Sequence, residues 1–337
     1  QLDLGLDARF FGGRLGLSFD YYLKTTKDWL VQAPILDSYG TSAPYINGGD
    51  VRNQGIEMAL NWNDHVGDFT YGVNLNLSHN KNEVTRIANS EGIIHGSPNI
   101  LSEGTTEMYR AQEGYPIGYF YGYKTLGVFQ SEKQIAEYSG AKLSGTAPGD
   151  LIFADTNKDG VIDDNDKCMI GNPHPDVIMG LTFNLGYKGF DLGITTNAVL
   201  GNQIARSYRS FADQPKENYT TDILGRWHGE GTSNRLPRVA SGTNTNWLYI
   251  SDIFIEDGDY FRIQNVTLGY DFKKLFPRIP LGQARLYVTA QNLATFTKYS
   301  GMDPEIGYGA DKSWVSGIDV GFYPSPRTYM VGVNLKF

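Results

Sequence analysis

Apolar and polar residues alternate one by one in segments that recur from one end of the chain to the other. The clearest segment is 327–337, where every second residue from Tyr329 to Phe337 is apolar. Successive side chains of a β-strand point to opposite faces, so this segment has one apolar and one polar face. The pattern predicts eleven strands, at 2–10, 14–25, 53–63, 68–82, 105–111, 116–125, 177–188, 190–200, 260–272, 284–293 and 327–337.

The connections between these strands alternate strictly between short and long. The short ones are 11–13, 64–67, 112–115, 188–189 and 273–283. The long, polar ones are 26–52, 83–104, 126–176, 201–259 and 294–326. Outer-membrane barrels have short periplasmic turns and long extracellular loops, and if Phe337 lies in the periplasm every long connection faces outside. We therefore predict an all-β, transmembrane antiparallel β-barrel that crosses the bacterial outer membrane many times; a secreted β-sandwich or β-helix is the alternative.

Eleven strands cannot close a bacterial single-chain barrel, because such barrels have even strand numbers. Two unpaired sheet edges in lipid would also leave backbone hydrogen-bonding groups unsatisfied. We expect the missing strands to come from an N-terminal part of the same protein. The start of the chain agrees with this expectation, since Gln1 begins an alternating segment without a signal peptide before it.

Composition narrows the possible functions. The 37 acidic residues outnumber the 29 basic ones, so the composition gives no basic footprint for nucleic acid or for anionic lipid. The single cysteine excludes an internal disulfide and a cysteine metal cluster. Aromatic residues near strand ends suit the membrane–water boundary, although a packed β-core would also accommodate them. They are Tyr21, Trp62, Tyr71, Tyr187, Phe190, Tyr270, Phe272, Tyr287 and Tyr329.

The sharpest local motif lies in the connection 126–176, which we expect to be a long extracellular loop. Residues 155–166 follow the D-x-[DN]-x-[DN]-G pattern of calcium loops, with Gly160 at the sharp turn and an Asp at the closing position, where Glu is usual. The expected Ca²⁺ ligands are the side chains of Asp155, Asn157, Asp159, Asp163 and Asp166 and the backbone carbonyl of Val161. A structural Ca²⁺ would stiffen the loop; the alternative is a loop of Asx turns that needs no ion.

Catalytic motifs are absent from the sequence. The five histidines are scattered without an H-E-x-x-H pattern, and no G-x-S-x-G occurs. Three tryptophans of the long connections, Trp227, Trp247 and Trp314, could stack on sugar rings, but we favour packing within the loops. The sequence therefore predicts a protein that is not an enzyme.

The final third of the chain resembles the SusC-like TonB-dependent transporters. Residues 255–270, IEDGDYFRIQNVTLGY, resemble one signature of that family. A second signature is similar to the run from Gln291-Asn292-Leu293 to Asp303-Pro304-Glu305. The closing strand with its terminal Phe337 resembles the signal read by the outer-membrane assembly machinery, and further similar blocks occur at 51–57, 114–123 and 149–173.

This resemblance implies a 22-stranded barrel whose lumen holds an N-terminal plug. It also implies a SusD-like surface lipoprotein as a lid and import of oligosaccharides or peptides driven by TonB. On this reading, residues 1–337 are the C-terminal portion of the transporter, embedded in the lipid bilayer, and the plug and the N-terminal strands are absent. A passive porin or a surface adhesin is the alternative function, and an outer-membrane hydrolase is a third.

Overall fold

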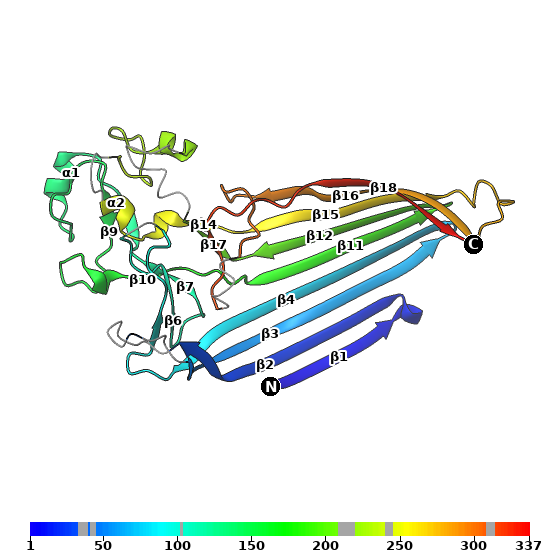
Figure 1. The fold of residues 1–337 in the computed structure, drawn as a ribbon, viewed down its shortest axis with the longest axis horizontal. Coiled ribbons are helices and arrows are strands. Elements are labelled where there is room, and N and C mark those ends of the chain that lie inside the picture. Colours follow the sequence, from blue (N-terminus) through cyan, green and yellow to red (C-terminus); the bar gives the residue numbers. More distant parts are fainter. Residues whose placement is uncertain (33–39, 41–44, 102–103, 208–219, 240–244, 308–313) are drawn as a thin grey trace.

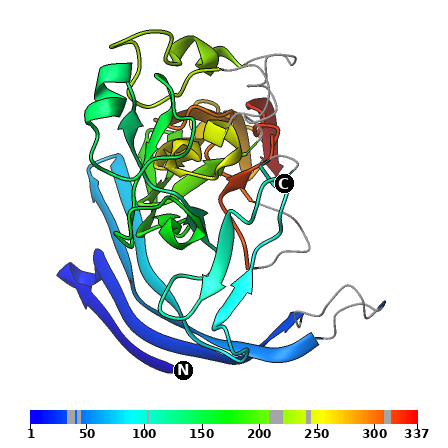
Figure 2. The same ribbon diagram turned by 90° about the vertical axis from the view of Figure 1, so that its left-hand side faces the viewer.

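A nine-stranded antiparallel sheet runs along the molecule (Figure 1). The computed structural model describes residues 1–32, 40, 45–101, 104–207, 220–239, 245–307 and 314–337. Neighbouring strands in the sheet are also consecutive in this list: β1 (Leu2–Phe10), β2 (Leu15–Gln32), β3 (Tyr45–Val66), β4 (Phe69–Ile87), β11 (Val177–Tyr187), β12 (Phe190–Leu200), β15 (Tyr260–Asp271), β16 (Gln283–Thr297) and β18 (Thr328–Lys336). The sheet is an up-and-down meander, and it is curved rather than flat (Figure 2).

One face of this sheet is apolar and the other polar. The register of the strands places the apolar residues of each strand beside those of its neighbours, and the polar residues likewise. Side chains directly opposite each other in a sheet share a face. The series Asp20, Glu57 and Ser78 runs across β2, β3 and β4 on what we call the polar face. The apolar face leaves large side chains exposed, namely Leu2, Leu4, Leu6, Phe19, Tyr21, Ile56, Phe69, Tyr187, Phe190, Leu268, Leu286, Val288, Val331, Val333 and Leu335.

The height of the apolar face suits a bilayer. Strand β11 has 11 residues, and the steps of about 3.4 Å from each residue to the next give a length of roughly 34 Å between its first and last residues. At the tilt of about 40° usual for membrane barrels, the strand rises roughly 26 Å, close to the apolar band of about 25 Å in outer-membrane barrels. Large exposed apolar side chains over such an area would make a water-soluble protein aggregate.

Short and long connections alternate, as predicted. The connections 11–14, 67–68, 188–189 and 272–282 lie at one end of the sheet, and 33–44, 88–176, 201–259 and 298–327 join the strands at the other end. There are four long connections instead of five. Strands β2, β3 and β4 also extend well past the predicted ends at 25, 53 and 82. The sequence does not alternate in these extensions, and β-bulges between Thr26 and Leu30 and between Asp50 and Val51 interrupt their pairing.

The predicted strands 105–111 and 116–125 do not join this sheet, and that part of the prediction is wrong. The structure has only β6 (Tyr109–Gln112) and β7 (Tyr119–Gly122) here, in a separate sheet with β5 (Ile93–His95) and β10 (Cys168–Gly171). Both faces of β6 are buried, so it cannot present one face to lipid. Positive φ angles at Gly114 and Gly118 also break the extended chain.

Three of the four long connections fold together into a body that we call the cap. The first, second and third cap connections are the described residues of 88–176, 201–259 and 298–327. The cap also contains the pair β8 (Thr125–Val128) and β9 (Leu151–Phe153), and the three strands β14 (Ile255–Asp257), β13 (Gln203–Arg206) and β17 (Ile318–Asp319). Its helices are α1 (Glu132–Glu137) and α2 (Thr245–Leu248), with short 3₁₀ turns at η3 (Asp164–Asp166), η5 (Thr221–Gly225) and η6 (Asp252–Phe254). No helix in the described part of the chain is long and apolar enough to cross a membrane.

The cap has one hydrophobic core to which all three connections contribute. Phe120 comes from the first, Trp247 and Phe254 from the second, and Ile318 from the third, and each is almost fully buried. A shared core of this kind makes the cap a folded unit instead of three independent loops.

Candidate functional site

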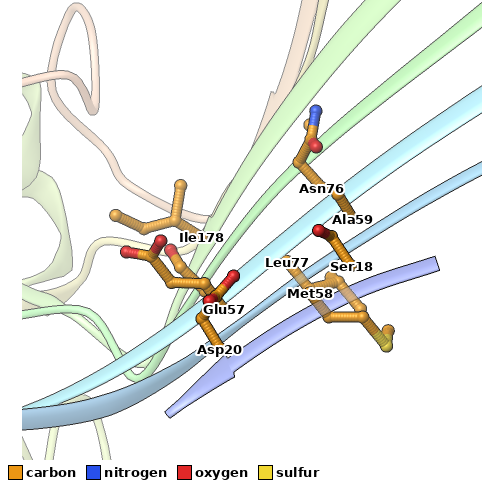
Figure 3. Close-up of a pocket in the computed structure, with 10 residues that line it drawn as sticks. Ser18, Asp20, Glu57, Met58, Ala59, Asn76, Leu77 and Ile178 are labelled. Atoms are coloured by element: carbon orange, nitrogen blue, oxygen red, sulfur yellow. The ribbon is translucent and has the colours of Figure 1, made fainter. Parts of the chain in front are cut away.

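The polar face carries an open hollow of about 340 Å³ at the level of β2 to β11 (Figure 3). Asp20 and Glu57 line it and stand directly opposite each other on neighbouring strands. Like charges in this position repel each other unless water or a polar partner surrounds them. The polar face is therefore built to meet water or a polar body, and it is unsuited to lipid.

Hydrogen bonds between side chains reinforce the polar face near the cap. The amide groups of Asn80 and Asn82 donate to Asn53 Oδ1 at 3.1 and 2.9 Å. Asn82 Oδ1 in turn accepts a hydrogen bond from the backbone amide of Ile117 at 2.8 Å. This network connects the wall of the sheet to the cap segment between β6 and β7.

A buried arginine of β15 attaches the third cap connection, 298–327, to the wall. Arg262, 4% exposed, forms an ion pair with Asp303, and its Nη1 donates to Glu305 at 2.7 Å. Its Nε donates to Thr295 Oγ1 at 3.0 Å. Asp303 also accepts a hydrogen bond from the backbone amide of Ser325 at 3.2 Å, so one charge cluster fixes both ends of this connection.

A second buried arginine joins different cap segments to one another. Arg206, at the end of β13, donates from Nη1 to Asp222 at 2.7 Å and to Ser300 Oγ at 2.6 Å. The carboxylate of Glu256 lies 3.4 Å from the same nitrogen. Because these residues come from the second and third connections, the contact holds the connections in a single arrangement.

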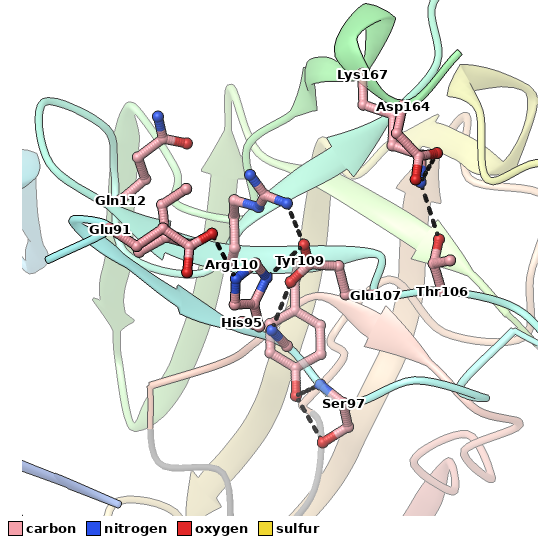
Figure 4. A network of polar contacts seen from close by, with 12 residues as sticks. Glu91, His95, Ser97, Thr106, Glu107, Tyr109, Arg110, Gln112, Asp164 and Lys167 are labelled. Atoms are coloured by element: carbon pink, nitrogen blue, oxygen red, sulfur yellow. Dashed lines mark hydrogen bonds and ion pairs between the residues drawn. The ribbon is translucent and has the colours of Figure 1, made fainter. Parts of the chain in front are cut away.

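The edge of the small sheet with β5 and β6 carries a charged network (Figure 4). The two ring nitrogens of His95 lie 2.9 Å from Glu107 and 3.1 Å from Glu91, and Glu107 also pairs with Arg110. Partial burial opposes protonation of His95, but the hydrogen bonds and charges of the two carboxylates outweigh it and raise the histidine pKa. The guanidinium carbon of Arg110 lies 3.3 Å from the centre of the Tyr121 ring, which adds a cation–π contact.

The predicted calcium-loop residues lie together in one turn that ends at η3. The two carboxylate oxygens of Asp155 accept from the amides of Asp159 and Gly160, at 3.2 and 2.9 Å. Those of fully buried Asp166 accept from Thr156 and Asp163, at 2.8 and 2.9 Å. Asn157, Asp159 and Asp163 likewise accept backbone amides, and the exposed Val161 donates its amide to Asp159. Within the described residues, no group of three or more His, Cys, Asp or Glu converges as metal ligands do.

Two further predictions concern aromatic residues. The packing of the three cap tryptophans is confirmed, since Trp247 is 2% exposed and Trp227 and Trp314 pack against the same core. Tyr287, however, does not belong to the apolar boundary. It pairs with Gly269 and Gly332 on the polar face, where its ring covers Gly332.

Sequence reasoning missed the arginine clusters. The available signal was Arg262 itself, a charge inside a strand whose neighbours alternate regularly. Its partners Asp303 and Glu305 lie about forty residues away, at separations of 41 and 43, so only the folded chain identifies them.

An apolar and a polar sheet face, short connections at one end and a folded cap at the other define the wall of an outer-membrane β-barrel. The chain belongs to the family described as TonB dependent receptor-like, beta-barrel, whose model matches residues 1–293. This membership confirms the all-β barrel class and the resemblance to TonB-dependent transporters. The family is one of outer-membrane receptors and not of enzymes.

Curated relatives match over nearly the whole chain. The TonB-dependent receptor P3 of Formosa agariphila is 36% identical over 345 residues, covering 100% of this chain and 34% of the relative. The TonB-dependent receptor SusC of Bacteroides thetaiotaomicron is 31% identical, covering 99% of this chain and 31% of the relative. The chain thus spans about a third of the length of these relatives.

Solved structures share the fold. The structure of the RagAB peptide transporter superposes with a TM-score of 0.78 at 22% identity, covering 99% of this chain and 34% of that chain. The same importer in its open-open state gives a TM-score of 0.75. At this identity the likeness supports the fold alone.

Proposed function

We propose that this chain forms the barrel wall and the extracellular cap of a TonB-dependent importer that takes up oligosaccharides or peptides across the outer membrane. The observation that carries the proposal is the cap, because three long connections share one core at a single end of a membrane-type sheet. A passive pore needs no such body, whereas an importer needs a rigid mouth that holds cargo and partner.

The complete importer, on this proposal, contains more polypeptide than these residues. Strands β1 and β18 form the two edges of the sheet, and an edge in lipid requires a partner strand. We propose that an N-terminal part supplies the remaining strands of a 22-stranded barrel, a plug against the polar face and the segment that engages TonB. Residues 1–337 are then the C-terminal portion, and the carboxylates lining the hollow at Asp20 and Glu57 face the plug side.

A SusD-like surface lipoprotein is the proposed partner of the cap. The similarity to the TonB-dependent receptor SusC and the fold shared with the RagAB peptide transporter support this, because the resemblance to SusC-like transporters implies such a lid. The proposed cargo is an oligosaccharide or a peptide. The RagAB structure is that of a peptide transporter, and what this chain shares with it is the fold.

Uptake by intact cells tests the proposal. A deletion strain complemented with the full-length gene is offered fluorescent oligosaccharides and peptides, with and without a protonophore. An importer takes up one cargo class, loses uptake in the deletion strain and stops when the proton gradient collapses. Uptake that continues with the protonophore would identify a passive porin instead.

We also propose that residues 155–166 bind a structural Ca²⁺. The order of oxygen donors from Asp155 to Asp166 and the positive φ of 87° at Gly160 support this. Each carboxylate oxygen that accepts one amide keeps a second lone pair for an ion. The bound ion would lock a turn packed beside the cap core through Ile162.

Calcium binding is testable on the purified complex. We expect added Ca²⁺ to raise the unfolding temperature of the wild type and to lose this effect in Asp159→Asn. Asp164→Asn is the matched control, since Asp164 lies in the same loop but pairs with Lys167 at 2.8 Å and is not an expected ligand. An unfolding temperature that millimolar Ca²⁺ leaves unchanged in the wild type contradicts the proposal.

A further inference from the structure

One of the connections at the short-turn end differs from the others. Residues 272–282, between β15 and β16, form an eleven-residue segment, while the turns at 67–68 and 188–189 have two residues each. The segment exposes Leu275 and Phe276, at 57% and 54% of their surface. With Pro277 and Ile279 they line an open hollow. Apolar side chains presented in this way need a non-aqueous partner.

The exposure of these side chains is built into the segment. The amides of Leu275 and Phe276 both donate to the carbonyl of Phe272, at 3.1 and 2.8 Å. The side chain of Lys273 donates to the carbonyl of Ile279 at 2.6 Å and closes the turn from the other side. A turn held by its own hydrogen bonds cannot fold its apolar residues away.

The segment continues an aromatic rim on the apolar face. The rings of Phe190 and Tyr270 lie 4.4 Å apart, and those of Tyr270 and Phe272 lie 5.2 Å apart. Lys188, in the neighbouring turn, places its ammonium 5.3 Å from the Tyr187 ring. Aromatic rings and snorkelling lysines occupy the boundary between hydrocarbon and headgroups.

Exposed cations accompany these apolar residues, although the chain as a whole is acidic, with a net charge of −8. Lys274 and Arg278 are exposed. Among the described residues, no carboxylate forms an ion pair with either of them. Cations beside exposed apolar side chains match an anionic phospholipid, whose phosphate and acyl chains present the same two chemistries.

We infer that residues 272–282 are an interfacial anchor that binds anionic phospholipid headgroups on the short-turn side of the membrane. Leu275 and Phe276 enter the acyl-chain region next to the headgroups, and Lys274 and Arg278 contact the phosphates. The inference rests on the proposed placement of the chain in the outer membrane, but it adds a lipid site that import itself does not require.

The test uses the complete transporter in nanodiscs of phosphatidylethanolamine with or without phosphatidylglycerol. Native mass spectrometry counts retained phosphatidylglycerol, and titration gives the apparent affinity. In Lys274→Gln/Arg278→Gln we expect on the order of 30-fold weaker binding at this site, since each cation near the surface contributes a factor of about five. Leu275→Ser/Phe276→Ser should weaken retention of both lipids.

The matched control is Lys133→Gln/Lys142→Gln, which removes the same charge from α1 and from the cap segment that follows it. It should leave phosphatidylglycerol retention unchanged. Equal losses in the two double variants would reveal a general charge effect and overturn the anchor. Unchanged retention in Lys274→Gln/Arg278→Gln, or protection of Lys274 from amine labelling only when a periplasmic protein is added, would also overturn it. Failure of the protein to fractionate with outer membranes would instead refute its proposed location.

Discussion

Replacing Arg262 by glutamine should release the third cap connection, 298–327, from the barrel wall. The arginine is 4% exposed and bonds with Asp303, Glu305 and Thr295. Glutamine keeps part of the length of the side chain but removes the charge, so Asp303, 9% exposed, is left as a buried carboxylate without its cation.

The size of the effect follows from the burial of each partner. Removing one member of a buried ion pair costs about 3–5 kcal/mol, because the other charge remains without compensation. The Glu305 side chain is 60% exposed, so the loss of its contact adds little. We take about 3 kcal/mol for local opening, which corresponds to roughly a hundredfold rise in the open population.

Hydrogen exchange followed by mass spectrometry measures this opening. Amides of 298–307 and 314–327 should exchange roughly a hundredfold faster in Arg262→Gln, while amides of β11 and β12 keep their protection. Adding Asp303→Asn should recover part of the loss, because the uncompensated charge disappears. Arg14→Gln is the control, since its pair with Asp64 has a half-exposed arginine and should change local stability by less than about 1 kcal/mol. Exchange in Arg262→Gln no faster than in this control would refute the reasoning.

Three further outcomes are expected. Gly332→Ala should lower the yield of assembled barrel, measured by heat-modifiable mobility on gels, because a Cβ there would lie 2.3 Å from Tyr287 Cζ; yield equal to wild type would contradict it. Trp247→Ala should destabilise the cap by about 3–5 kcal/mol, seen as faster proteolysis of the cap before the wall. His95→Gln should remove a pH dependence of cap stability. Because the folded-state pKa of His95 is raised, its contact with Glu107 stabilises the cap at acidic pH and weakens as pH rises through that pKa; a pH profile identical to wild type would refute this.

The sequence alone determined the barrel wall. Alternation with a period of two defined the strands 177–188 and 190–200 to within a residue of β11 and β12. The alternation of short and long connections determined which end of the sheet carries the cap. Both signals are local, because the choice of face and the closing of a turn depend on neighbouring residues.

Tertiary structure decided how the long connections fold. Residues 105–125 carry strand-like sequence, yet they pack on both faces in the cap core, and alternation cannot distinguish burial by protein from exposure to lipid. Arg262 and Asp303 are 41 positions apart, and their meeting depends on the path of the whole connection. The sequence therefore determined the wall through local periodicity, whereas the cap and its buried arginines depended on long-range packing that no short pattern encodes.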